Sequence, residues 1–340
     1  MRAALMHEYK SPLRIEEVDE PSLADSNVLI KVNVCGVCFT DVKIWNGKVG
    51  PHPTLPHILG HEISGTVNRM GKNVSSFAEG DRVIVYLYDT CDTCMACKTG
   101  KDNHCINMGP LVGFNRPGAF AEFISVPSKN VFKIPGNLDM TQAALLPDAV
   151  ITPYHAVTEK AQVRFNDTAI VIGMGGLGLS CLQILKLLGA RVFSVSRTDG
   201  KLDMARKLGA DATINPRSTN VVEETKRLTD GYGVDFVFDT VASAETIDEG
   251  LRSLKRGGKA VLFGYESEPT PIVTRNLTVG LTSLQSTRGG TRQNLKDLIR
   301  LASEGKLKSI VTHEYALDDA NVALAKLSQG EVTGRVTLKL

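Results

Sequence analysis

Hydrophobic and polar positions divide the 340-residue chain into two parts with different periodicity. In the first part, short alternating or continuous apolar runs are separated by glycine and proline, a pattern typical of β-strands. The strands expected there are 28–34, 63–67, 82–87 and 120–126. In the second part, short apolar runs alternate with longer helical segments, which predicts a doubly wound parallel sheet.

The strands expected in the second part are 169–172, 192–195, 213–214, 234–238 and 260–263. One helix is expected to run through Leu188, and another to end near Gly209. A last helix is expected from about Thr291, because apolar residues recur on one helical face at Leu295, Leu298, Ile299 and Ala302. The chain is longer than the roughly 250–300 residues at which one hydrophobic core stops growing, so an α/β protein of two domains is expected.

Composition and charge place the chain among ordinary globular proteins, with 42% hydrophobic and 22% charged residues. The formal net charge of +2 gives no electrostatic reason to expect a nucleic acid or an anionic membrane as partner. The first ten residues contain no apolar segment of signal-peptide length. We therefore expect a cytoplasmic protein with reduced cysteines.

Four cysteines form a compact insertion between two of the expected strands, with the spacing Cys91-x2-Cys94-x2-Cys97-x7-Cys105. Thiols this close together in a polar segment predict a closed, structural zinc site. Two alternatives remain: buried cysteines without a ligand, and a four-iron cluster. The usual bacterial iron–sulfur run differs, because it has three residues before its fourth cysteine and a proline after it.

A second group of candidate ligands lies earlier in the chain, at Cys38 and His61. A thiol and an imidazole are ligands that zinc prefers, and an acidic residue lies close to each in sequence, Asp41 and Glu62. Two ligands do not complete a site, so this hypothesis requires a third ligand from elsewhere in the chain.

A glycine-rich turn follows the expected strand 169–172 and precedes a helix. It reads Gly173-Met174-Gly175-Gly176-Leu177-Gly178. Glycines in this position allow a tight turn and bring a pyrophosphate close to the helix N-terminus. The placement between strand and helix therefore predicts a dinucleotide site.

The end of the second strand of that domain indicates which dinucleotide is bound. An NAD site usually has an acidic residue there for the ribose 2′-hydroxyl, whereas this chain has Ser196, Arg197 and Thr198. A guanidinium and two hydroxyls suit a 2′-phosphate, which favours NADP. The alternative is that Arg197 is a solvated loop residue and that Asp199 takes the role of the acid, in which case NAD would be the cofactor.

Taken together, these three motifs resemble the zinc-dependent medium-chain alcohol dehydrogenases over essentially the whole chain. The resemblance implies a GroES-like, β-rich catalytic domain of residues 1–149 and 287–340, with a structural zinc lobe at 91–105. It also implies a Rossmann NADP-binding domain of residues 150–286, two zinc ions per chain, and a homodimer or homotetramer.

The resemblance also assigns roles within the catalytic site. Cys38 and His61 match two ligands of the catalytic zinc, and Asp148 occupies the place of the third, where many members have cysteine. The alternative for Asp148 is an acidic residue at a helix N-terminus after a proline. Glu62 is expected near the metal as an exchanging ligand, and Thr40 matches the hydroxyl that takes the proton of the alcohol.

Further residues carry over with less specific motifs. Lys43 stands where the proton relay of the family often ends in histidine. Thr152 matches a residue near the nicotinamide, and Arg335 matches one that reaches the pyrophosphate. Asp41 resembles the acid that orients the histidine ligand, and Trp45 is expected either to line the substrate pocket or to pack in the core.

The implied function is reversible hydride transfer from a zinc-bound alkoxide to the nicotinamide. The expected substrates are a small alcohol, polyol or sugar and its carbonyl product. One alternative is a zinc-free quinone or enoyl reductase of the same superfamily, which would lack the pair Cys38 and His61. The other is a non-catalytic NADP-binding protein.

Overall fold

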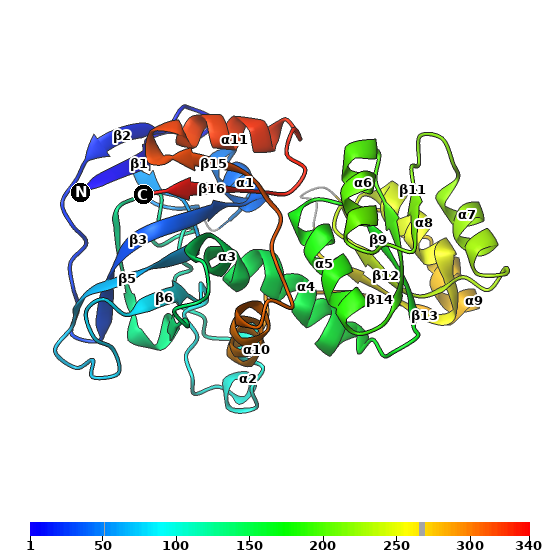
Figure 1. The fold of residues 1–340 in the computed structure, drawn as a ribbon, viewed down its shortest axis with the longest axis horizontal. Coiled ribbons are helices and arrows are strands. Elements are labelled where there is room, and N and C mark those ends of the chain that lie inside the picture. Colours follow the sequence, from blue (N-terminus) through cyan, green and yellow to red (C-terminus); the bar gives the residue numbers. More distant parts are fainter. Residues whose placement is uncertain (51, 265–268) are drawn as a thin grey trace. The chain divides into compact units, whose positions relative to one another are not determined.

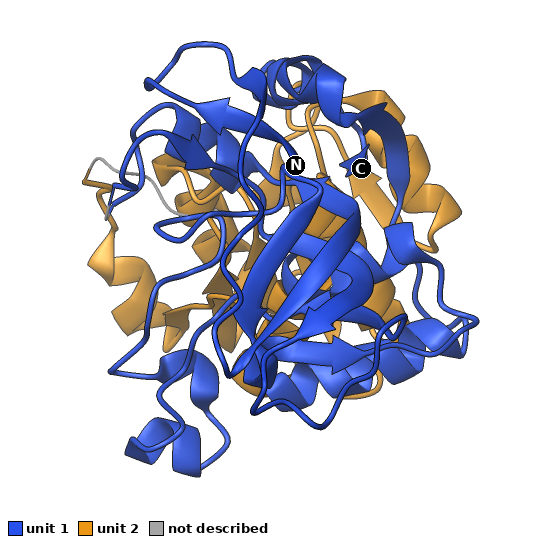
Figure 2. Cartoon of the chain, turned by 90° about the vertical axis from the view of Figure 1, so that its left-hand side faces the viewer, with its two compact units in different colours: residues 1–149, 291–340 blue, residues 150–290 orange. Residues whose placement is uncertain are grey.

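The computed structural model describes residues 1–50, 52–264 and 269–340 and divides into two compact units (Figure 2). Unit 1 consists of residues 1–149 and 291–340, and unit 2 consists of residues 150–290. None of the helices in these described ranges has the length and apolar character needed to cross a membrane.

Unit 1 is rich in β-strands, and the last part of the chain returns to it. Its helices and strands are, in chain order, β1 (Arg2–Met6), β2 (Arg14–Glu17), β3 (Asn27–Val37), α1 (Phe39–Trp45), β4 (His57–Ile58), β5 (Glu62–Met70), β6 (Arg82–Val85), α2 (Met95–Lys98), β7 (Phe123–Pro127), β8 (Val131–Lys133), α3 (Met140–Leu145), α10 (Arg292–Ser303), β15 (Val311–Ala316), α11 (Ala320–Ser328) and β16 (Arg335–Lys339). The strands form a three-stranded sheet, β2-β1-β4, and a seven-stranded sheet, β15-β16-β3-β5-β6-β8, in which β7 also pairs with β3 (Figure 1).

The long strand β3 is the centre of the larger sheet, because β5, β7 and β16 all pair with it. Almost all of its residues are buried, as expected for a strand with neighbours along both edges. Its carboxyl end lies opposite the start of β5, with Gly36 paired to Glu62, and beside the start of β16, with Val37 paired to Val336. This register brings three segments that are far apart in sequence to one end of the sheet.

The strand expected at 120–126 begins later, at Phe123. Phe120 is fully buried, but its backbone bonds with Ala4 and Leu59 instead of joining the ladder between β7 and β3. The hydrophobic run therefore marks burial correctly and places the start of the strand too early.

Unit 2 contains the doubly wound sheet. Its helices and strands are α4 (Ile151–His155), β9 (Thr168–Ile172), α5 (Gly176–Leu187), β10 (Arg191–Val195), α6 (Asp199–Lys207), β11 (Ala212–Ile214), α7 (Val221–Leu228), β12 (Val234–Asp239), α8 (Ala244–Ser253), β13 (Leu254–Leu262), α9 (Thr274–Gly280) and β14 (Ser283–Ser286). The six strands pair in parallel in the order β11-β10-β9-β12-β13-β14, which confirms the predicted fold class. The chain reverses direction across the sheet at β9, so a ligand crevice is expected beyond the carboxyl end of this strand.

Candidate active site

Four potential metal ligands meet at the end of β3 in unit 1. The ligand atoms of Cys38, His61, Glu62 and Asp148, named here the Cys38 cluster, all lie within 4.8 Å of one another. Asp148 Oδ2 lies 3.5 Å from Cys38 Sγ and 3.5 Å from His61 Nε2. A candidate for the third ligand that the sequence required therefore lies beside Cys38 and His61, 110 residues after Cys38 in the chain.

The larger sheet and one helix position these side chains. Cys38 follows β3 directly and caps the N-terminus of α1, while His61 and Glu62 lie where β5 begins opposite that point. Asp148 belongs to a π-helical segment, Leu146–Val150, which continues α3. Helix α3 lies against β3 and β5, and Ser64 Oγ donates a hydrogen bond of 2.7 Å to the carbonyl of Met140. A π-helical turn inserted in this way often marks a functional site.

Asp41 connects the two segments that carry Cys38 and His61. Its fully buried carboxylate accepts hydrogen bonds from the backbone N–H of Cys38 at 2.8 Å and of Gly60 at 3.2 Å. Its Oδ1 also lies 3.1 Å from Nδ1 of His61. This contact favours the tautomer in which Nδ1 carries the proton, which leaves the lone pair of Nε2 directed towards the cluster.

Glu62 is held by Arg335, which begins β16. The Arg335 guanidinium donates to Glu62 Oε1, and both side chains are buried. A Cβ at position 36 would lie 2.0 Å from Glu62 Oε2, so the glycine at this position makes room for the carboxylate. Arg335 was expected at the pyrophosphate; in the structure its described ion pair is with Glu62 in unit 1.

Burial opposes the ionised forms of Cys38 and Glu62, whereas the neighbouring cations His61 and Arg335 hold the pKa of Asp148 well below its usual range. Burial and the Asp148 carboxylate raise the pKa of Cys38. Burial raises the pKa of Glu62 to about 7, although the charge of Arg335 acts in the opposite direction. Burial disfavours the charged form of His61, but the carboxylates of Asp41 and Asp148 outweigh this effect and raise its pKa. A bound metal ion would stabilise the Cys38 thiolate and the Glu62 carboxylate, whose ionised forms burial disfavours.

The hydrogen bonding of the cluster also fits a metal ion. His61 Nε2 and Glu62 Oε2 are buried and have no hydrogen-bond partner among the described residues. A sulfur, an imidazole nitrogen and carboxylate oxygens are donors that zinc accepts in catalytic sites. The residues present therefore fit a zinc ion held by Cys38, His61 and Asp148, with Glu62 beside it.

Other residues expected near this cluster are placed as follows. Thr40 is partly exposed, and its Oγ1 lies 3.6 Å from Cys38 Sγ. Lys43 is on the same helix, α1. Trp45 donates a hydrogen bond of 2.6 Å from its indole nitrogen to the carbonyl of Ser11 and packs against the hydrophobic core. This contact favours the packing role for Trp45.

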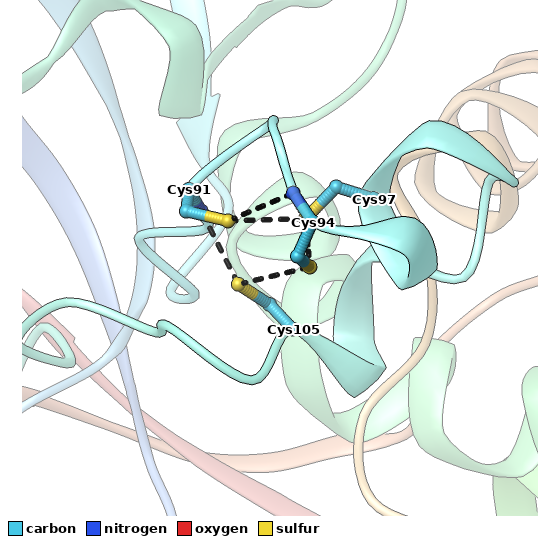
Figure 3. Close-up of side chains that lie close together, drawn as sticks. All are labelled: Cys91, Cys94, Cys97 and Cys105. Atoms are coloured by element: carbon cyan, nitrogen blue, oxygen red, sulfur yellow. Dashed lines mark hydrogen bonds between the residues drawn. The ribbon is translucent and has the colours of Figure 1, made fainter.

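The four-cysteine lobe, residues 91–105, brings its sulfur atoms together, as Figure 3 shows. The Sγ–Sγ distances are 4.0 Å for Cys91–Cys97, 3.5 Å for Cys94–Cys97 and 4.0 Å for Cys94–Cys105. A tetrahedral zinc with Zn–S bonds of about 2.3 Å requires sulfur atoms about 3.8 Å apart. The geometry therefore suits a single ion better than either alternative, unliganded thiols or a larger iron–sulfur cluster.

Hydrogen bonds to sulfur favour the thiolate form of Cys91 in the lobe. The Thr93 hydroxyl and the backbone N–H of Cys94 lower the pKa of Cys91 to about 5. The lobe supplies four sulfur atoms, which is the complete ligand set that a closed, structural zinc site requires.

The lobe is attached to the start of α10 through Asp102. This buried carboxylate accepts from the Tyr86 hydroxyl at 2.8 Å and from the backbone N–H of Arg292 at 3.1 Å. The Arg292 side chain donates to Asp92, next to Cys91. The lobe therefore anchors the point at which the chain returns to unit 1.

The glycine-rich turn in unit 2 has the conformation that its sequence predicts. Gly173 has φ +90°, and the Thr240 hydroxyl donates to its carbonyl at 2.9 Å. A Cβ on Gly178 would lie 2.0 Å from the carbonyl oxygen of Gly173, so the helix α5 can approach the turn only with glycine there. Gly176 and Leu177 form the first turn of α5 after the cap at Gly175, where the helix presents free backbone N–H groups.

In unit 2, a cavity of about 620 Å³ opens beyond the carboxyl ends of β9, β10 and β12. Five residues expected to bind the cofactor line it: Gly173, Gly175, Ser196, Arg197 and Thr198. The cavity is also lined by polar residues that were not expected, among them Lys201, Arg217 and Thr240. Lys201 could have been found from its position four residues after Arg197, whereas no local sequence signal marks Arg217.

Thr152 is buried on α4, apart from the residues that line this cavity. Gly176, Leu177 and Gly178 are likewise not part of the cavity wall. These three residues lie in the first turn of α5.

Comparisons with known proteins agree with this architecture. Residues 24–136 match the alcohol dehydrogenase GroES-like domain, and residues 176–304 match the zinc-binding dehydrogenase domain. The chain is 33% identical to an NAD-dependent alcohol dehydrogenase of Sulfolobus acidocaldarius, with 100% of both chains covered.

Two solved structures are similar over the full chain. The alcohol dehydrogenase of the hyperthermophilic archaeon Aeropyrum pernix aligns with a TM-score of 0.93 at 34% identity, covering 100% of both chains. A protein of Sinorhizobium meliloti described as a zinc-binding dehydrogenase, solved with NADP bound, aligns with a TM-score of 0.90 at 27% identity, covering 100% of this chain and 99% of that one. The chain therefore belongs to the zinc-dependent medium-chain alcohol dehydrogenase family.

Proposed function

We propose that this protein is an NADP-preferring zinc alcohol dehydrogenase that interconverts a small alcohol, polyol or sugar with its carbonyl product. Membership of the family supports an oxidoreductase that acts on alcohols with zinc and NAD or NADP. The observation that carries the proposal is the convergence of Cys38, His61, Glu62 and Asp148, with His61 Nε2 left without a hydrogen bond.

The residues of the Cys38 cluster have distinct proposed roles. Cys38, His61 and Asp148 would hold the zinc ion, which supplies a Lewis acid that makes an alcohol hydroxyl more acidic near neutral pH. Asp41 fixes the orientation and tautomer of His61. Arg335 holds one oxygen of Glu62 and leaves the other facing the cluster as a further ligand.

Thr40 is the proposed acceptor of the proton from the alcohol. Its hydroxyl lies next to Cys38 Sγ and is partly exposed, so it is placed at the edge of the cluster and within reach of a bound hydroxyl. Lys43 lies one helical turn further along α1, at the position where the proton relay of the family often ends in histidine.

The preference for NADP rests on the charges at the end of β10. Arg197, Ser196 and Thr198 line the cavity, and no acidic residue stands between them. Asp199, the candidate for an NAD-type acid, accepts a hydrogen bond of 2.8 Å from Asn215 and is not part of the cavity wall. This arrangement favours a 2′-phosphate over a 2′-hydroxyl.

We also propose two zinc ions per chain, one in the Cys38 cluster and one in the four-cysteine lobe, and a catalytic role for unit 1 with cofactor binding in unit 2.

The homodimer or homotetramer implied by the family is supported by the edge strand β14. Its outer edge has no partner strand in the described structure, and Val273, Val279 and Leu281 nearby are exposed. Light scattering coupled to gel filtration would measure the assembly.

Initial rates with primary alcohols, secondary alcohols, polyols and aldoses test the activity, followed by the absorbance of the reduced nicotinamide. We expect oxidation in at least one class and a much larger kcat/KM for NADP than for NAD. Arg197→Ala should narrow that difference. Equal use of both cofactors would refute the charge argument, and no turnover with any class would favour a non-catalytic protein or a reductase of another type.

A further inference from the structure

Three cationic side chains line the same wall of the cofactor cavity. Arg197, Lys201 and Arg217 all border it, although only Arg197 belongs to the segment that the sequence assigned to the cofactor. They come from three places in the chain: the end of β10, the first turn of α6 and the loop after β11.

The register of the parallel sheet explains why these segments meet. Strands β10 and β11 are neighbours, with Val195 paired to Ile214, so the loops that follow them leave the sheet side by side. The backbone N–H of Ser196 donates to the carbonyl of Ile214 at 3.2 Å. A hydrogen bond of 2.8 Å between Asn215 and Asp199 then ties the loop that carries Arg217 to the helix that carries Lys201.

No acidic partner neutralises these cations in the part of the chain that the structure describes. Neither an ion pair nor a side-chain hydrogen bond involves Arg197, Lys201 or Arg217 in residues 1–50, 52–264 and 269–340. Arg197 and Lys201 line the same cavity, and burial and the Arg197 guanidinium lower the pKa of Lys201. A bound anion would remove this repulsion.

The acidic residues of the cavity lie on its other side. Glu245 and Glu249 line it from α8, which follows β12. In the sheet, β12 and β10 lie on opposite sides of β9, so the glycine-rich turn after β9 separates the acidic side from the basic side. An anionic ligand group is therefore attracted to the side of β10 and β11 and repelled from the side of α8.

We propose that Lys201 and Arg217, together with Arg197, bind the 2′-phosphate of NADP. Lys201 and Arg217 thereby contribute to the choice between NADP and NAD. The proposal rests on the proposed function, because it assumes a cofactor with a phosphate at this position. In a dinucleotide fold the ribose 2′ position lies at the end of the second strand, here β10, which is the place where the three cations meet.

Calorimetric titration of the full-length protein with two probes tests this assignment without requiring turnover. The probes are adenosine 2′,5′-bisphosphate, which carries the 2′-phosphate, and adenosine 5′-monophosphate, which lacks it. Lys201→Gln and Arg217→Gln should each raise the Kd of the bisphosphate about tenfold, as expected for loss of a charge-assisted hydrogen bond. The Kd of the monophosphate should change less than about twofold, since its contacts are elsewhere in the site.

Lys207→Gln is the matched control, because Lys207 is an exposed lysine on the same helix that does not line the cavity. It removes the same charge and should leave both Kd values at the wild-type level. Arg217→Lys keeps a cation and should retain most of the affinity for the bisphosphate, which guards against a variant that fails to fold. Higher salt should weaken bisphosphate binding more in the wild type than in the double variant Lys201→Gln, Arg217→Gln.

The outcomes separate this proposal from the proposed function. A wild-type protein that binds both probes equally well would refute the preference for NADP itself, and this assignment with it. A wild type that prefers the bisphosphate, with variants that keep the same preference, would overturn only the roles of Lys201 and Arg217. Equal weakening of both probes would also overturn the assignment, because it would place these cations away from the 2′-phosphate.

Discussion

Replacing Asp41 with asparagine is predicted to weaken metal binding in the Cys38 cluster by about 10- to 100-fold, the range found when a residue that orients a ligand is changed. The fully buried Asp41 carboxylate accepts from the backbone N–H of Cys38 and of Gly60 and contacts Nδ1 of His61. Asparagine has one acceptor oxygen in place of two. Its amide nitrogen must therefore face at least one of these donors.

The magnitude follows from that mismatch. A buried donor left without an acceptor costs about 1–3 kcal/mol. Because about 1.4 kcal/mol corresponds to a factor of ten in an equilibrium constant, a loss of this size in the bound state gives an effect of the predicted order. The four-cysteine lobe shares no hydrogen bond with Asp41 in the described structure, so its metal affinity should not change.

Competition with a coloured zinc chelator, combined with elemental analysis, would measure the two sites separately in the same sample. Asp239→Asn is a matched control: Asp239 is also buried and accepts two backbone hydrogen bonds, from Val241 and Ala242, but it lies in unit 2. Added zinc should restore activity of Asp41→Asn. Wild-type zinc affinity in the Asp41→Asn cluster would refute the orienting role.

Three further predictions concern the glycine-rich turn, the four-cysteine lobe and Cys35. Gly178→Ala should weaken NADPH binding at least about tenfold, because its Cβ would lie 2.0 Å from the Gly173 carbonyl oxygen. Gly200→Ala is the control, because a Cβ at that position meets no atom within 4 Å. Equal NADPH affinities of the two variants in a fluorescence titration would contradict the role of Gly178. Asp102→Ala should lower the free energy of unfolding by about 2–5 kcal/mol, because the Tyr86 hydroxyl and the Arg292 N–H lose their acceptor. An unchanged midpoint of unfolding in urea would be inconsistent with the anchoring role of the lobe. Cys35→Ala should lower the free energy of unfolding by about 1 kcal/mol and keep the metal of the Cys38 cluster, because Cys35 is buried and does not belong to that cluster. Loss of one zinc ion on elemental analysis would show that Cys35 is a ligand.

The sequence predicts those parts of the site that depend on local spacing. The closely spaced cysteines of the lobe, the glycines between β9 and α5, and the position of His61 before β5 can all be identified from neighbouring residues. The doubly wound sheet was also predictable, because its buried strands are continuous apolar runs. Strand β14, with the sequence Ser-Leu-Gln-Ser, has no such pattern and was not expected.

Features that depend on distant segments could not be predicted from residue patterns. The π-helical segment that carries Asp148 has no local sequence signature, and the ion pair between Glu62 and Arg335 results from the register of β16 beside β3. Arg217 reaches the cofactor cavity only because β11 pairs with β10. In each case a non-local strand pairing or an irregular turn decides which side chains meet.

The zinc content of the wild type and of Asp148→Ala, measured together with NADP-linked alcohol oxidation, tests the central claim most directly. Two candidate metal clusters are present in the described structure, and Asp148 belongs to only one of them. We predict two zinc ions per chain in the wild type, and in Asp148→Ala one zinc ion, retained in the four-cysteine lobe, with loss of activity. An Asp148→Ala variant that kept both zinc ions and the wild-type rate would contradict the account.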